Sequence, residues 1–180
     1  SAISRALGAN DVARAEALAH HSVIFGVAMG LVFTSVFIGF GALIFRLLGG
    51  QGATLDQALS YANIAFLGSI GIWLTNTLAS VLRGTGNMRV PSAVLLVGAG
   101  LQIALGGSLG LGLGPMPRLG MPGIALGQVI AFAVSAAYFA WYLGFGRARI
   151  RLRLAGPLQW PMFRDILKVG AVACVSPMQS

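Results

Sequence analysis

A few polar and aromatic side chains stand inside long uncharged stretches, and these are the residues best suited to chemistry. Their amide and hydroxyl groups offer hydrogen bonds, and their one indole ring can stack on a cation. They are Trp73, Thr75, Asn76, Gln102 and Gln128. The uncharged stretches hold no paired carboxylates and no nucleophile–base pair, so an enzyme is not supported. The predicted chemistry is therefore reversible contact with a ligand or with another helix.

The sequence also contains two adjacent histidines and one cysteine. His20 and His21 are predicted to lie near one end of a helix and to be solvated there. No carboxylate or cysteine accompanies them at the spacing of metal ligands, so no metal site is predicted. Cys174 has no partner for a disulfide within the chain. We therefore expect neither a bound metal nor a cofactor.

Composition indicates which elements hold these residues. Hydrophobic residues make up 57% of the 180 residues and charged residues only 9%, whereas soluble domains carry about a quarter charged residues. Four runs lack a formal charge, and each exceeds the roughly 20 helical residues that cross a bilayer. These runs do not alternate between polar and apolar residues, so helices rather than barrel strands are predicted. The uncharged runs are 22–45, 57–82, 90–117 and 119–146.

The runs predict an all-α, polytopic transmembrane helix bundle with four complete spans and partial flanking helices. Asn10 or Asp11 is predicted to cap the helix that contains the first span. Residues 47–56 are predicted to form a flexible outer loop, 147–168 a cytoplasmic linker, and 169–180 the start of a further helix. The predicted spans are about 22–45, 59–82, 92–113 and 122–145.

Basic residues lie unevenly on the two sides of these spans. Of the 12 lysines and arginines, all fall on one side except Arg46 and Arg118. Because basic residues favour the cytoplasmic side, we predict a multi-pass protein of the cytoplasmic (inner) membrane with 84–90 and 147–168 inside. This orientation explains the net charge of +8, so the lipid bilayer is an expected partner and nucleic acid is not.

The stretch 82–91 reads LRGTGNMRVP and joins the second predicted span to the third. Its two glycines permit a tight reversal, its asparagine tolerates turn geometry, and its proline suits the first turn of a helix. Its arginines are predicted to lie at the headgroups, with Arg83 reaching carbonyls at the end of its helix. The residues of this predicted cytoplasmic turn are Arg83, Gly84, Gly86, Asn87, Arg89 and Pro91.

The sequence LRGTGNMRVP also resembles the signature loop that follows the fourth helix of the multidrug and toxic compound extrusion (MATE) transporters. SAISRALGANDVARAEAL resembles the loop between the second and third helices of that family. RLGMPGIALGQVIAF resembles its entry into helix six, and FRDILKVGAVACVSPMQS its approach to helix seven. The resemblance covers nearly the whole chain in the right order.

This resemblance implies a polypeptide of about twelve helices in two lobes, monomeric and of bacterial origin, in which our chain supplies helices three to six of the first lobe. It implies secondary active efflux of organic cations or other amphipathic drugs in exchange for protons or sodium. Alternating access would come from rocking of one lobe against the other. The expected partners are small amphipathic substrates and the remaining helices of the same polypeptide.

The resemblance also implies where coupling residues lie. The family's asparagine and aspartate on helix five correspond to Gly100 and Ala104, so the chain lacks both side chains. A coupling carboxylate is therefore expected on helix one, outside this chain. Gln128 falls where relatives often carry a threonine that lines the cavity, whereas Gln102 is predicted to point away from Gly100.

The second predicted span adds three candidates for contact with substrate. Trp73 could stack on a cationic aromatic substrate, and Thr75 and Asn76 supply hydrogen-bonding groups. The alternative for each polar candidate, Gln102 and Gln128 included, is a hydrogen bond to a neighbouring helix.

Two other functions remain open at this point. A flippase for lipid-linked oligosaccharides of the same superfamily would share the topology, but it needs arginines around a diphosphate, and no predicted span contains one. A non-transporting membrane scaffold subunit would lack polar groups that face a cavity, and Asn76, Gln102 and Gln128 are present.

Overall fold

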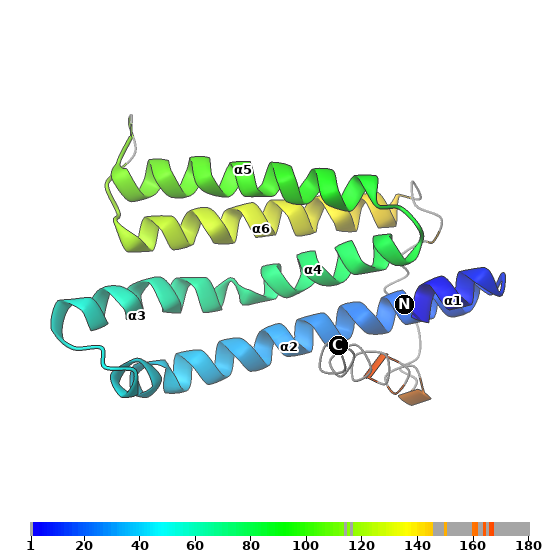
Figure 1. The fold of residues 1–180 in the computed structure, drawn as a ribbon, viewed down its shortest axis with the longest axis horizontal. Helices are drawn as coiled ribbons and strands as arrows, with labels where there is room; N and C mark the ends of the chain where they lie inside the picture. The colour runs from blue at the N-terminus through cyan, green and yellow to red at the C-terminus, as the bar shows by residue number, and fades with distance from the viewer. Residues whose placement is uncertain are drawn as a thin grey trace, which may run out of the picture.

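The computed structural model describes residues 2–113, 115 and 117–145, together with 150, 160, 161, 164, 166 and 167 (Figure 1). The helices within these residues are α1 (Ala2–Gly8), α2 (Val12–Leu47), α3 (Gly52–Leu67), α4 (Ser69–Gly84), α5 (Arg89–Leu111) and α6 (Met121–Gly144). The predicted all-α class is confirmed. The predicted linker at 147–168 falls largely outside the described residues, and the predicted helix start at 169–180 falls entirely outside them.

The long helices lie side by side. α5 packs against α6, α6 against the α3–α4 pair, and that pair against α2 (Figure 1). α1 packs against α2. Asp11 caps the first turn of α2, because its carboxylate accepts a hydrogen bond from the Arg14 amide (2.9 Å). The predicted cap at Asp11 is confirmed.

The second predicted span is a broken helix rather than a continuous one. α3 begins at Gly52, inside the stretch predicted as a flexible loop, and α4 continues to Gly84. The two helices meet at Gly68 and are bent by 48°. Leu55 in the first turn of α3 is buried, and this burial favours the early helix start over a loop.

The break at Gly68 is supported by hydroxyl groups and by close packing. Thr34 Oγ1 donates to the carbonyl oxygen of Phe66 (2.6 Å) and lies 2.8 Å from Ser69 Oγ. A Cβ atom at Gly68 would collide with the side chain of Val129 on α6. The hydroxyls therefore satisfy a backbone group near the bend, which an apolar environment requires.

α2, α5 and α6 are each long and apolar enough to cross a membrane, and the bent α3–α4 pair makes a fourth crossing when it is taken as one span. Large apolar side chains are exposed along these helices, and Phe40 is 60% exposed and Leu96 74%. Apolar surface of this extent indicates contact with lipid or with further helices. The structure thus agrees with a polytopic membrane bundle.

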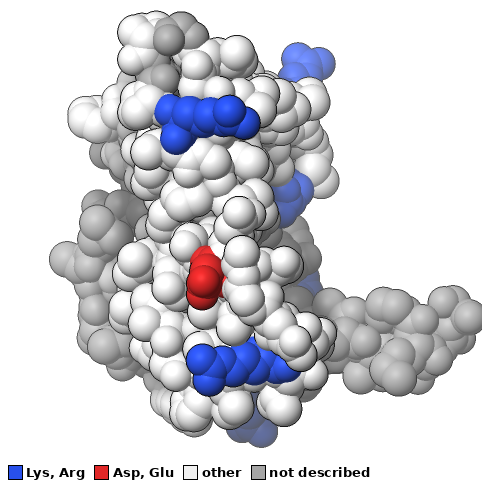
Figure 2. Space-filling view, turned by 90° about the vertical axis from the view of Figure 1, so that its left-hand side faces the viewer, with Lys and Arg blue, Asp and Glu red and all other residues white. Residues whose placement is uncertain are grey.

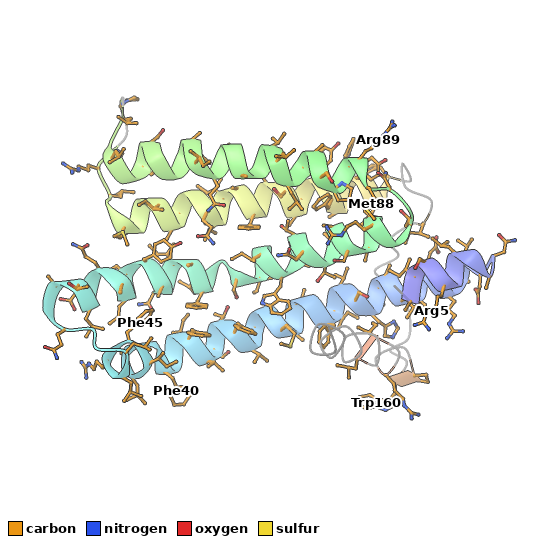
Figure 3. The ribbon with its side chains drawn as sticks, in the orientation of Figure 1. Arg5, Phe40, Phe45, Met88, Arg89 and Trp160 are labelled. Carbon is orange, nitrogen blue, oxygen red and sulfur yellow. The ribbon has the colours of Figure 1, made fainter. Side chains whose placement is uncertain are left out.

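The two ends of the bundle carry different residues. Arg5 and Arg89 lie at one end together with Met88, whereas Phe40 and Phe45 lie toward the other end of α2 (Figure 3). This separation is compatible with the predicted orientation. Which end faces the cytoplasm stays a prediction.

The prediction that His20 and His21 are solvated is wrong. Their side chains are 8% and 2% exposed, because packing covers this part of α2. The two rings meet edge to face with centroids 5.6 Å apart. His21 Nδ1 lies 2.7 Å from the carbonyl oxygen of Ala17, one turn earlier in the same helix.

Candidate functional site

The turn between α4 and α5 is closed by backbone hydrogen bonds. The Gly86 amide donates to the Arg83 carbonyl (3.0 Å) and the Asn87 amide to the Leu82 carbonyl (3.2 Å), which is the bond pair of a Schellman motif. Gly86 supplies the positive φ of +85° that this motif needs. Gly84 is instead a buried residue of α4, so only one of the two predicted glycines makes the reversal.

Side chains fix both sides of this turn. Asn87 Oδ1 accepts from the Val90 amide (3.1 Å), and Asn87 Nδ2 donates to the Tyr142 hydroxyl on α6 (3.4 Å). Arg83 donates to Ser80 Oγ (2.8 Å) one turn back in α4. The contact predicted between Arg83 and carbonyls at the helix end is therefore replaced by a hydroxyl contact.

The helix after the turn starts earlier than its predicted span. α5 begins at Arg89, which is exposed, rather than at Ser92. Pro91 is its third residue and is fully buried. The missing N–H of Pro91 thus falls within the first turn, where no helical partner is lost.

An open groove of about 710 Å³ lies between α3, α5 and α6, and most of the residues that line it are exposed; we call it the α3–α5–α6 cavity. Its polar lining comes from Gln57 and Ser60 of α3, Gln102 of α5 and Arg118 of the α5–α6 connection. The other lining residues are Ile103, Gly106, Gly107, Gly110, Leu111, Leu119, Gly120, Met121, Pro122 and Ile124. A few polar groups thus stand among aliphatic ones, as in many sites for small molecules.

Gln128 lies on the same side of α6 as this cavity. It stands one turn after Ile124, which lines the α3–α5–α6 cavity, and one turn before Phe132. Phe132 lines a smaller pocket of about 80 Å³, and Gln102 borders both spaces. Gln128 itself is not among the residues that line either space.

The Gln128 side chain is joined to α3. The Tyr61 hydroxyl donates to Gln128 Oε1 over 2.7 Å. The bond links two helices. It therefore agrees with the alternative role for Gln128, a hydrogen bond to a neighbouring helix rather than to substrate. It occupies one acceptor of the amide, and the amide nitrogen can still donate two hydrogens to a ligand.

Gln102 was predicted to lie on the opposite side of its helix from Gly100, and the structure agrees. Gln102 lines both the α3–α5–α6 cavity and the smaller pocket. Gly100 and Ala104 are exposed and are not among the residues that line either space. The rotation of α5 against α6 therefore turns the Gln102 side, rather than the Gly100 side, toward α6.

Trp73 and Asn76 lie at a different place. They line a second cavity of about 320 Å³ between α1, α2 and α4, the α1–α2–α4 cavity. The Trp73 ring is tilted against Phe33 with centroids 5.4 Å apart. Asn76 Nδ2 donates to the Ile72 carbonyl in its own helix (2.9 Å). The structure thus separates these two residues from Gln102 and Gln128.

Thr75 lines neither cavity among those described above. Its side chain is fully buried, and its Oγ1 donates to the Phe132 carbonyl on α6 (3.0 Å). The Thr75 hydroxyl therefore makes a hydrogen bond to a neighbouring helix, which was the alternative to substrate contact.

Four residues near the α3–α5–α6 cavity were not among the predicted candidates: Gln57, Ser60, Tyr61 and Arg118. The α3 residues follow the i, i+3, i+4 spacing of one helical face, which could have revealed them. Gln57 lies just before the second predicted span of about 59–82, whereas Ser60 and Tyr61 lie inside it. Arg118 was taken only as a marker of topology.

Comparison with known proteins identifies relatives along the same stretch. Residues 1–106 match the family model MatE. Multidrug export protein MepA of Staphylococcus aureus (strain NCTC 8325) is 30% identical over 173 residues, which cover 95% of this chain and 37% of MepA. Probable multidrug resistance protein NorM of Thermotoga maritima is 27% identical over 169 residues, which cover 93% of this chain and 36% of NorM.

Solved structures share the helix arrangement. A crystal structure of MATE in the bent conformation matches with a TM-score of 0.89 and 27% identity, covering 98% of this chain and 39% of that one. An inward-facing multidrug resistance MATE family transporter of the MOP superfamily matches with a TM-score of 0.86 and 28% identity, covering 94% and 38%. The chain thus spans well under half the length of these relatives. Because the family model matches more than half of its residues, the chain belongs to the MATE family of multidrug and toxic compound extrusion transporters.

Proposed function

We propose that these residues form part of the first lobe of a secondary active exporter in a bacterial cytoplasmic membrane. The exporter would move amphipathic drugs outward in exchange for protons or sodium. Family membership supports this function, as do relatives named as multidrug export and multidrug resistance proteins. The observation that carries it is the α3–α5–α6 cavity, where amides stand among aliphatic groups between apolar helices.

Contacts around the cavity suit a lobe that moves as one body. Tyr61 joins α3 to Gln128 of α6, and Thr75 joins α4 to the Phe132 carbonyl of the same helix. Both halves of the broken span are thereby held to α6. In an alternating-access exporter, such a unit would rock against the second lobe around the bound substrate.

The ion that drives export would bind elsewhere in the exporter. Gly100 and Ala104 carry no side-chain oxygen at the family's positions on helix five, and the uncharged runs contain no carboxylate. We therefore place the coupling carboxylate on a helix outside this chain. The α1–α2–α4 cavity adds an aromatic surface, Trp73, on which an organic cation could stack.

The two alternative functions receive less support. A scaffold has no need of a cavity with four polar lining residues, yet Gln57, Ser60, Gln102 and Arg118 line one. A flippase for diphosphate-linked oligosaccharides would be expected to surround its substrate with several arginines. Arg118 is the single arginine among the described residues that line the α3–α5–α6 cavity.

Drug export can be measured with the complete exporter in everted membrane vesicles. We expect accumulation of a fluorescent organic cation when a proton or sodium gradient is imposed. Dissipating the gradient that drives transport should abolish accumulation, because the substrate is moved against its own gradient. Accumulation equal to that of vesicles without the exporter, under both gradients, would contradict the proposed function.

A further inference from the structure

We propose that Thr34 of α2 is a positioning residue for the broken span: its hydroxyl holds the last turn of α3 and thereby sets the angle between α3 and α4. This angle decides where α3 lies against α6, and α3 carries Gln57 and Ser60, two residues of the α3–α5–α6 cavity. The role rests on the proposed function only where the angle affects transport, since the angle itself can be measured without a substrate.

The ladder of backbone hydrogen bonds is irregular at the break. The Gly71 amide donates to the Gly68 carbonyl (3.0 Å), three residues back, whereas each amide of an α-helix donates four residues back. In a continuous helix the Phe66 carbonyl would accept from the Ile70 amide. At this break Thr34 Oγ1 donates to the Phe66 carbonyl (2.6 Å). A hydroxyl of α2 thus takes the place of a helical donor at the end of α3.

Thr34 and Ser69 share two hydroxyl hydrogens among three contacts. Besides its contact with Phe66, Thr34 Oγ1 lies 2.8 Å from Ser69 Oγ. The buried Ser69 Oγ also lies 2.9 Å from the Gly30 carbonyl oxygen of α2. Each hydroxyl has one hydrogen to donate, so only two of the three contacts can be hydrogen bonds at one time.

This count makes the two hydroxyls unequal. Without the Ser69 hydroxyl, the Thr34 hydrogen still serves the Phe66 carbonyl. Without the Thr34 hydroxyl, that carbonyl loses its donor from α2, and Ser69 can only hold α4 to the Gly30 carbonyl. The hold on α3 therefore belongs to Thr34, although the two hydroxyls touch each other.

Aromatic rings on α2 contact both sides of the same break. Phe37, three residues after Thr34, stacks on Phe66 with centroids 4.0 Å apart and ring planes within 5°. Phe33 is tilted against Trp73 of α4 with centroids 5.4 Å apart. Stacked rings can slide past one another, whereas a hydrogen bond is directional. The rings therefore hold α3 close to α2, and the Thr34 hydroxyl fixes its direction.

The end of α3 far from the break has few charged groups that could fix it. Figure 2 views the end of the molecule where α2 ends and α3 begins, and its basic and acidic side chains stand apart on an otherwise uncharged surface. Isolated surface charges contribute little to holding helices together. The contacts at the break thus weigh more in the direction of α3.

A change of the bend would be felt along α3. Tyr61 lies seven residues before Gly68, about 10 Å along the helix, so a swing of about 20° would displace it by about 3.5 Å. A displacement of this size would break the 2.7 Å hydrogen bond from the Tyr61 hydroxyl to Gln128 Oε1. Thr34 therefore keeps α3 against α6 by holding the end of α3.

A simpler account is that packing alone produces the bend. Val129 of α6 fills the space beside Gly68, where a Cβ atom would collide with it. Packing of this kind does not depend on a hydroxyl of α2. Thr34→Val separates the two accounts, because valine keeps the branched shape of threonine and has no hydroxyl.

The test measures the bend in the complete exporter, in nanodiscs without substrate. Spin labels are attached at Thr54→Cys and Met88→Cys, two exposed positions near opposite ends of the α3–α4 pair, in a cysteine-free background that includes Cys174→Ala. Their separation is measured by double electron–electron resonance. Full straightening of the 48° bend would lengthen it by about 4 Å.

Thr34→Val should lengthen the mean separation by about 2–4 Å, because the released Phe66 carbonyl regains a donor only when the helix continues and the Ile70 amide reaches it. Thr34→Ser keeps a hydroxyl and should keep the wild-type separation. Thr34→Ala removes the same hydroxyl and takes the place of Thr34→Val if the valine variant does not accumulate.

Ser69→Ala is the matched control within the same cluster. It removes a buried hydroxyl that touches Thr34, yet it should leave the separation unchanged, because the Thr34 hydrogen still serves Phe66. An unchanged separation without the Thr34 hydroxyl, or the same lengthening in Ser69→Ala, would overturn the positioning role.

Transport is measured separately in everted vesicles. Thr34→Val should lower the initial rate of drug uptake severalfold, because Gln57 and Ser60 move with α3, and Thr34→Ser should restore the rate. If the wild-type exporter moves no drug while Thr34→Val still lengthens the separation, the proposed function fails and the positioning role stands.

Discussion

Replacing Gly127 by valine should prevent the protein from accumulating in the membrane. α5 and α6 approach so closely at this point that a Cβ atom on Gly127 would collide with the backbone of Gly106. Backbone cannot move aside as a flexible side chain can, so we expect a loss of about 3 kcal/mol or more of stability. The measurement is membrane abundance, followed by the thermal unfolding midpoint of the purified exporter in detergent.

Gly100→Val is the matched control for this prediction. Gly100 lies within the same helix pair, on α5, and a Cβ atom there would have no neighbour within 4 Å. The change in helix propensity from glycine to valine is the same in both variants, so only Gly127→Val adds the collision. Equal abundance and equal midpoints for the two variants would show that the backbones are not in close contact.

Gln128→Ala should lower drug transport about tenfold while membrane abundance stays normal. If the Gln128 amide donates to the substrate, its removal takes away one hydrogen bond. The initial rate of drug uptake into everted vesicles, divided by exporter abundance, measures the effect.

Tyr61→Phe separates substrate contact from helix contact. This variant removes the hydroxyl that donates to Gln128 Oε1 but leaves the amide in place. If Gln128 contacts the substrate, Tyr61→Phe should keep most of the transport rate. If the two variants lose the same fraction of activity, the interhelical bond alone accounts for Gln128.

The helical type of the membrane spans could be predicted because the bilayer imposes it. Uncharged runs of sufficient length, together with the absence of alternation, leave helices as the only solution. The cap at Asp11 and the turn glycine Gly86 could also be predicted, because each has a signature in the local sequence. These features depend on neighbours in the sequence and not on packing.

The break at Gly68 could not be predicted in this way. Nothing in the run around it is charged or contains proline. Its cause is tertiary, because Thr34 on α2 binds the Phe66 carbonyl and Val129 on α6 occupies the space of a side chain at Gly68.

The sequence also could not predict which polar candidates line the same cavity. Gln102 and Asn76 look alike as amides in apolar runs, yet they line different cavities because helix rotation is set by contacts with neighbours. The close glycine contact between α5 and α6 fixes that rotation for Gln102. Arg118 enters the lining only because the connection folds back along α5.

The central claim is that the α3–α5–α6 cavity holds the transported molecule, and substrate protection tests it most directly. Ile103→Cys, in the Cys174→Ala background of the complete exporter, places a thiol on the α3–α5–α6 cavity at a side chain that is 76% exposed, so its exposure is similar to that of the control site. Phe40→Cys, on the exposed surface of α2, is the control. A saturating drug concentration should slow thiol modification severalfold at Ile103→Cys and leave the rate at Phe40→Cys unchanged. Equal rates at Ile103→Cys with and without drug would contradict the account.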